Sequence, residues 1–164
     1  MTSRISVRGR YLLTAMRGDE LLWQITQDNF VTDQGLSYMA SAALQGGAVQ
    51  PSWYVGIKGG YDDALPTDTL ASKLWPEVNA GSSTRPQWVA TSVQPGRVSN
   101  YASPAVITFT VDAEVSGVFL ASGPSVGATS DLLFSVADWL TEQPMRAGDK
   151  ISAIYEMNLE AADV

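Results

Sequence analysis

Alternation of apolar and polar residues marks both ends of the chain. The first apolar set lies at odd positions: Ile5, Val7, Tyr11, Leu13 and Ala15. Successive side chains of a strand point to opposite faces, so this spacing predicts a half-buried strand. Turn residues follow at 17–20, and a second alternating run begins at Leu21, which together predict a β-hairpin. The clearest strand is the last, over residues 151–159.

One segment changes to the helical period. Its apolar residues are spaced i, i+3, i+4, i+7 and i+8: Leu36, Met39, Ala40, Ala43 and Leu44. This spacing predicts a short helix near residues 33–44 with one apolar face. Thr32 or Asp33 supplies an N-cap, and the Gly46-Gly47 pair ends the helix.

The rest of the chain is predicted as strands and loops. Besides the N-terminal hairpin, the candidate strands cover residues 52–58, 75–80, 87–92, 105–113, 115–122, 132–136 and 151–159. About nine short strands with frequent Gly and Pro between them are typical of a sandwich or barrel. We therefore predict a mainly β fold, an antiparallel β-sandwich or jelly-roll-like domain. Residues 1–164 form one domain in this prediction, because no linker or repeat divides them.

The amino-acid composition limits the chemical functions that the chain can perform. The 164 residues include no histidine and no cysteine, which removes the commonest general base, the commonest metal ligand and thiolate sites. We predict that the chain is not an enzyme, with no catalytic, cofactor-binding or metal-binding residues. The net charge of −7 opposes binding to nucleic acid and to an anionic membrane. No apolar run has the length of a membrane span, and Met1–Arg10 does not resemble a secretion signal.

The basic residues are unevenly placed. Four of the ten, Arg4, Arg8, Arg10 and Arg17, lie within the first seventeen positions. Three of them share the even positions of the first predicted strand. Either this is a solvated strand face, or residues 1–10 are an N-terminal arm, mobile or docking on another subunit. If residues 1–10 are such an arm, the candidate interface residues are Arg4, Arg8, Arg10 and Tyr11.

Other short motifs have simpler explanations. Arg17-Gly18-Asp19 is an integrin-type triplet, but it falls where a hairpin turn is predicted. Asp62, Asp63 and Asp68 offer calcium-type ligands on one loop, although their spacing does not match a calcium-binding loop.

Carboxylates and aromatic residues provide two further candidates. The pairs Asp112/Glu114 and Asp138/Glu142 could in principle serve a glycosidase, but charged residues near strand ends explain them equally well. The five tryptophans are scattered over separate segments, so they are expected mostly in the core.

A series of short motifs runs in order through residues 8–159: Arg8-Gly9-Arg10-Tyr11, Trp53-Tyr54-Val55-Gly56-Ile57, Asp68-Thr69-Leu70-Ala71-Ser72, Trp75-Pro76-Glu77-Val78, Arg85-Pro86-Gln87-Trp88, Gly117-Val118-Phe119-Leu120-Ala121-Ser122 and Ala147-Gly148-Asp149. In this order the motifs resemble a family of small bacteriophage virion structural proteins. Lys73 stands where the family often has histidine, and the acidic pair Asp62-Asp63 is a further departure.

The resemblance implies a function in the phage particle. We predict a capsid decoration (cement) protein on the virion surface, made in the host bacterial cytoplasm, whose partner is the major capsid protein or another virion protein. A homo-oligomer such as a trimer is expected, because oligomers at lattice symmetry axes multiply weak contacts. The alternative is a tail, neck or fibre-tip component, including a receptor-binding one.

Overall fold

The computed structural model describes residues 4–162 and confirms the predicted mainly β fold with one short helix. Ten antiparallel strands form one strongly curled sheet, a half-barrel. The elements are β1 (Arg4–Arg17), β2 (Glu20–Val31), α1 (Asp33–Leu44), β3 (Trp53–Lys58), β4 (Gln87–Trp88), β5 (Ser92–Gln94), β6 (Arg97–Ser99), β7 (Ala105–Thr108), β8 (Ala113–Ala121), β9 (Leu133–Met145) and β10 (Lys150–Ala162).

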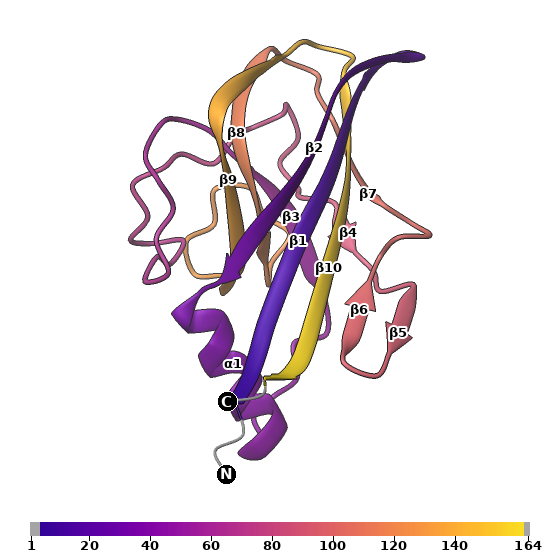
Figure 1. Ribbon diagram of the computed structural model, residues 1–164. Coiled ribbons are helices and arrows are strands. Elements are labelled where there is room, and N and C mark those ends of the chain that lie inside the picture. The colour runs from indigo at the N-terminus through magenta and orange to yellow at the C-terminus, as the bar shows by residue number, and fades with distance from the viewer. Residues whose placement is uncertain (1–3, 163–164) are drawn as a thin grey trace.

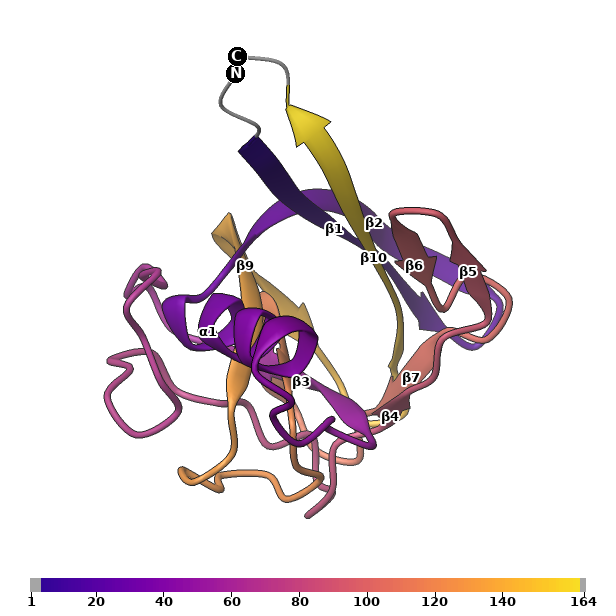
Figure 2. The same ribbon diagram turned by 90° about the horizontal axis from the view of Figure 1, so that it is seen from below.

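The curl brings two halves of the sheet face to face, as in a sandwich. One half has the order β2-β1-β10-β6-β5, with β7 also pairing with β10, and the other has the order β4-β3-β8-β9. Within residues 4–162, the backbone pairing between the halves consists of two residue pairs, Phe30 with Val136 and Val31 with Ser135. At its C-terminal end β2 therefore leaves β1 and pairs with β9 (Figures 1 and 2).

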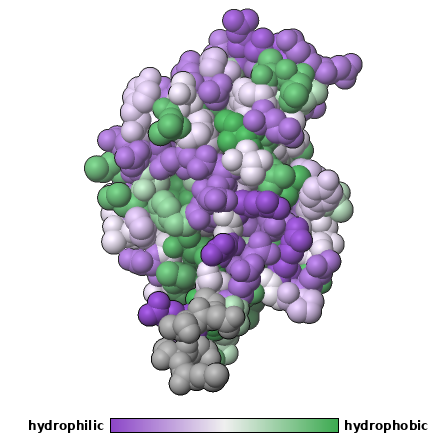
Figure 3. All heavy atoms as spheres, in the orientation of Figure 1, coloured by the Kyte–Doolittle hydropathy of each residue, from purple (hydrophilic) through white to green (hydrophobic). Residues whose placement is uncertain are grey.

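The two-residue period of the strands explains which side chains form the core. The odd residues Tyr11, Leu13 and Ala15 of β1 are fully buried, and so are Ile151 and Ala153 of β10. Their side chains pack inside the curl against β8 and β9, which carry apolar residues on both faces. The outward face of β1 and β2 is largely hydrophilic, with hydrophobic residues interspersed (Figure 3).

The helix forms where its period predicts. The N-cap is Thr32, whose Oγ1 accepts a hydrogen bond of 3.0 Å from the Gly35 N–H; this satisfies one of the free donors at the helix start. The same hydroxyl donates to the Leu133 carbonyl, so the cap also ties the helix to β9. Gly46, with φ +67°, lies just past the C-cap Gln45.

Several segments differ from the sequence prediction. The strand predicted over residues 87–92 is only the two-residue β4, and the strand predicted over residues 105–113 ends at Thr108 in β7. Residues 75–80 contain only an isolated bridge from Glu77 to Lys58, because Trp75 turns into the core and Pro76 follows it. The hairpin of β5 and β6 was not predicted, and β9 is longer than the 132–136 segment. Within residues 4–162, no helix combines the length and apolar character required to cross a membrane.

Candidate functional site

Both ends of the described chain meet in a two-stranded ribbon. Strand β1 pairs with β10 from Arg4↔Ala162 to Met16↔Lys150, whereas β2 pairs with β1 only from Gly9↔Asn29 onward. Residues 4–8 and 158–162 therefore extend beyond the three-stranded part of the sheet, and we call them the terminal ribbon. Figure 2 shows β1 and β10 reaching away from the curled body toward the two chain ends.

One face of the terminal ribbon carries two arginines together with Glu160, which lies opposite Ser6, and the other face is apolar. Arg4 and Arg8 lie at even positions with their side chains exposed. Ile5 and Val7 lie on the face that becomes the core farther along β1, and Ile5 is 78% exposed. Among the ion pairs of the described chain, none includes Arg4 or Arg8. Two cations and an exposed aliphatic side chain thus lie together at one end of the molecule.

Arg10 is engaged within the chain. Its guanidinium lies 3.1 Å from Glu156 of β10, and Arg97 of β6 binds the other oxygen of the same carboxylate. Burial alone would raise the pKa of Glu156, but the hydrogen bond from Arg97, with the Asn158 amide and Arg10, outweighs it and lowers the pKa. Arg10 therefore helps to hold β1, β10 and β6 together.

Tyr11 is a core residue, although it was a candidate for the interface. Its side chain is fully buried, its hydroxyl lies 2.7 Å from Ser135 Oγ, and its ring centroid is 4.6 Å from that of Tyr155. Burial, with Tyr155 nearby, raises the pKa of Tyr11 well above its ordinary value. The odd position of Tyr11 places it on the opposite face from the arginines, so it offers no surface to another chain.

A hollow of about 500 Å³ lies beside the terminal ribbon, where β2 departs. Arg8, Arg10, Asp28 and Glu160 contribute to its lining. Asn29 also lines it, and its Oδ1 is buried without a hydrogen-bond partner. The hollow has charges of both signs and is open to solvent, so it offers polar contacts beside the ribbon but no enclosed binding chamber.

The integrin-type triplet occupies the β1–β2 turn, as the turn prediction expects. Arg17 donates two hydrogen bonds, of 2.8 and 2.9 Å, to Asp149. Those bonds lower the pKa of Asp149. The arginine of the triplet is therefore held against the β9–β10 turn.

The candidate carboxylates are dispersed. Asp68 is buried and accepts hydrogen bonds from the Trp75 indole and the Leu65 N–H, whereas Asp62 and Asp63 are exposed. Asp112 accepts from the Ala147 N–H. Among residues 4–162, no three carboxylates gather in a group that could hold a metal ion.

The second acidic pair frames a buried lysine that the sequence did not single out. Lys58 Nζ lies 3.1 Å from Asp138 Oδ1 with only 2% of its side chain exposed, and Glu142 accepts a hydrogen bond from the Gly60 N–H. Lys58 ends β3 in a sequence of ordinary strand residues, so no local signal indicates its burial. Its partner lies 80 positions away.

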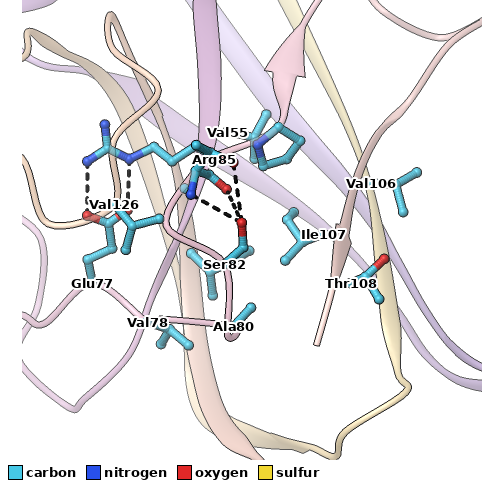
Figure 4. Close-up of a pocket in the computed structure, with 14 residues that line it drawn as sticks. Val55, Glu77, Val78, Ala80, Ser82, Arg85, Val106, Ile107, Thr108 and Val126 are labelled. Carbon is cyan, nitrogen blue, oxygen red and sulfur yellow. Dashed lines mark hydrogen bonds and ion pairs between the residues drawn. The ribbon is translucent and has the colours of Figure 1, made fainter. Parts of the chain in front are cut away.

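A cavity of about 260 Å³ opens between β3 and β7 (Figure 4). Its walls combine aliphatic residues, among them Val55, Ile57 and Ile107, with polar residues such as Ser82 and Thr84. Arg85, beside it, donates two hydrogen bonds to Glu77, one to Asp131 and one to the Gly123 carbonyl. Four of the donations that a guanidinium can make are thus used within the protein, so Arg85 is a structural group that fixes the loops around the cavity.

No protein-family model matches the chain, and no curated protein is significantly similar to it. Of the four residues proposed from the sequence, the structure brings Arg4 and Arg8 together on an exposed ribbon, binds Arg10 to Glu156, and buries Tyr11.

Proposed function

We propose that the chain is a structural protein of a bacteriophage particle, a decoration protein that binds the assembled head and stabilises it. The observation that carries the proposal is the terminal ribbon, a preformed basic element at one end of an otherwise acidic chain. The order of sequence motifs that resemble phage virion proteins supports the same class.

The ribbon suits attachment to a lattice. Arg4 and Arg8 would meet an acidic surface of the major capsid protein, and charge complementarity would orient the contact. Because the ribbon is already ordered through β10, less conformational entropy is lost on binding than with a free arm. In a homo-oligomer such as a trimer, several ribbons would bind together and convert weak contacts into avidity.

Copy number in the particle tests the proposal. Quantitative mass spectrometry of purified virions would measure this chain against the major capsid protein. A ratio of the same order as the capsid protein supports decoration. A few copies per particle would instead indicate the tail, neck or fibre-tip alternative, and absence from virions would contradict both.

Stabilisation of the head is the second measurement. Particles that lack the chain should lose their DNA at a lower temperature than particles to which the purified chain has been added back. The charge reversals Arg4→Glu and Arg8→Glu should weaken the rebinding. The matched double reversal Arg146→Glu/Lys150→Glu, at exposed positions near the other end of β10, should not.

A further inference from the structure

Among residues 4–162, no strand lies beside Ile5 and Val7 on the side of β1 away from β10. The Leu159 N–H donates to the Gly96 carbonyl, so it points away from β1. Leu159 lies directly opposite Val7. In an antiparallel ladder, the N–H and C=O groups of two residues that face each other either all point between the two strands or all point away from them. The N–H and C=O of Val7 therefore face away from β10, and so do those of Ile5, two residues earlier.

That outward side is the side which β2 leaves. Pairing between β1 and β2 ends at Gly9↔Asn29, and the next residues of β2, Phe30 and Val31, pair with β9. The edge of β1 at residues 4–8 is thus an open strand edge. Such an edge is a template for an additional strand.

We propose that this edge binds an extended acidic segment of a partner protein, which adds as a strand beside β1. The proposal rests on the proposed function for the identity of the partner, a neighbouring virion protein, but its chemistry follows from the edge alone. The added strand would bond to the main chain of Ile5 and Val7 and place acidic side chains opposite Arg4 and Arg8.

The charges next to the edge select the partner. Side chains directly across from each other on neighbouring strands lie about 5 Å apart, whereas a residue one strand farther away is about 10 Å distant. Arg4, Ser6 and Arg8 are the outward residues beside the added strand, and Glu160 lies on β10, beyond β1. Two acidic residues four positions apart, with a small polar residue between them, would match this edge.

The apolar face of the terminal ribbon determines which residues fit at the alternate positions of the added strand. Ile5, 78% exposed, and Val7 face the other side of the ribbon together with Leu159. Aliphatic residues between the acidic ones would cover Ile5 and remove it from water. The segment that fits therefore alternates aliphatic and polar residues.

A second copy of the chain fits less well. Antiparallel pairing of two β1 edges centred on Ser6 would place Arg4 opposite Arg8 of the other copy. A pairing centred on Val7 would place Arg4 opposite Arg10. Like charges directly opposite each other destabilise a sheet, which favours a heterologous acidic strand.

Binding of a short peptide tests this edge independently of whether the chain is part of a virion. The probe is an acetylated, amidated peptide of sequence Val-Glu-Val-Thr-Val-Glu-Val, and the control peptide has lysine in place of glutamate. Nuclear magnetic resonance of the labelled full chain would follow the amides of Ile5 and Val7. At a peptide concentration about ten times the Kd, their hydrogen exchange should slow about tenfold, and the lysine peptide should have no effect.

Three variants test the mechanism. Val7→Pro removes one free-edge N–H without removing a β1–β10 bond, so binding of the acidic peptide should be lost. Val7→Ala keeps that N–H and should weaken binding less. Arg4→Glu/Arg8→Glu should exchange the preference, so that the lysine peptide binds and the glutamate peptide does not, whereas Arg146→Glu/Lys150→Glu should retain the original preference.

The outcomes separate the two proposals. Failure of the acidic peptide to slow exchange at Ile5 and Val7 would overturn strand addition, even if the chain were abundant in virions. Protection of these amides without peptide, together with a dimer in sedimentation, would assign the edge to a second copy and overturn the acidic partner. Peptide binding by a chain that is absent from virions would uphold the edge and reject the decoration function.

Discussion

Tyr11 on β1 and Ser135 on β9 join the two halves of the curled sheet through a hydrogen bond of 2.7 Å between their side-chain oxygens. They are 124 positions apart in the chain. Both side chains are fully buried, and burial raises the pKa of the Tyr11 hydroxyl well above its ordinary value. The hydroxyls are therefore neutral groups that hold the sheet together inside an apolar core.

Removing this hydrogen bond should destabilise the chain. Tyr11→Phe keeps the ring and its packing on Tyr155 but leaves Ser135 without this partner. We expect the free energy of unfolding to fall by about 1–2 kcal/mol, measured by chemical denaturation. In a double-mutant cycle, Ser135→Ala should cost less in the Tyr11→Phe background than in the wild type, and purely additive losses would argue against a direct interaction.

Local sequence patterns identified most elements, because their causes are local. The odd-position apolar residues of β1 predicted the hairpin, and the period of residues 36–44 predicted α1. Of the two predicted N-cap candidates, Thr32 and Asp33, the structure has Thr32. The same parity also indicates why Tyr11 is buried, since it shares the face of Leu13 and Ala15. Tyr11 was grouped with the arginines because it follows Arg10 in the sequence. Consecutive residues of a strand, however, point to opposite faces.

The candidate site depended on long-range pairing and was only partly predictable. The arginine cluster was visible in the sequence, but the open edge arises where β2 exchanges β1 for β9 at Phe30, and nothing in residues 27–31 indicates this exchange. The capture of Arg10 by Glu156 likewise depends on the register between β1 and β10. Trp75 was predicted in a strand, yet its indole bonds to Asp68 and anchors a loop instead.

Arg85 should be among the most sensitive positions. Its side chain is 1% exposed and pairs with Glu77 at 2.8 Å and with Asp131 at 2.9 Å. Arg85→Met would leave the buried carboxylate of Glu77 and the partly buried one of Asp131 without their cation, so a loss of about 3–5 kcal/mol in unfolding free energy is expected. Arg97→Met, which breaks a pair with a half-exposed arginine, should cost about 1 kcal/mol or less; equal losses would contradict a special role for Arg85.

The pair of Arg17 and Asp149 should make stability depend on pH on the acid side. The hydrogen bond from Arg17 lowers the pKa of Asp149 below its ordinary value of 3.8, so the unfolded chain binds a proton at a higher pH than the folded chain does. The contribution to stability is complete above about pH 5 and is lost as the pH falls through the folded-state pKa. Thermal unfolding from pH 7 to pH 2 would measure it.

Two variants check the assignment of this acid-side dependence. Asp149→Asn should lower the stability at pH 7 and flatten its decline in acid. Asp19→Asn, at an exposed position in the β1–β2 turn, should change the pH 7 stability little. An unchanged acid decline in Asp149→Asn would assign the effect to other carboxylates.

Gly9 should be required where the terminal ribbon joins the body. A Cβ at this position would overlap Asn29 Oδ1 and would lie 2.8 Å from the Tyr155 hydroxyl. Gly9→Ala should therefore push β2 away from β1 and lower the unfolding free energy by about 1–3 kcal/mol. Because Asn29 Oδ1 has no hydrogen-bond partner, the second change Asn29→Ser should relieve the overlap and restore part of the loss. If Asn29→Ser brought no recovery in the Gly9→Ala background, close packing against Asn29 could not be the reason for a glycine at position 9, and contact with Tyr155 would remain as the cause.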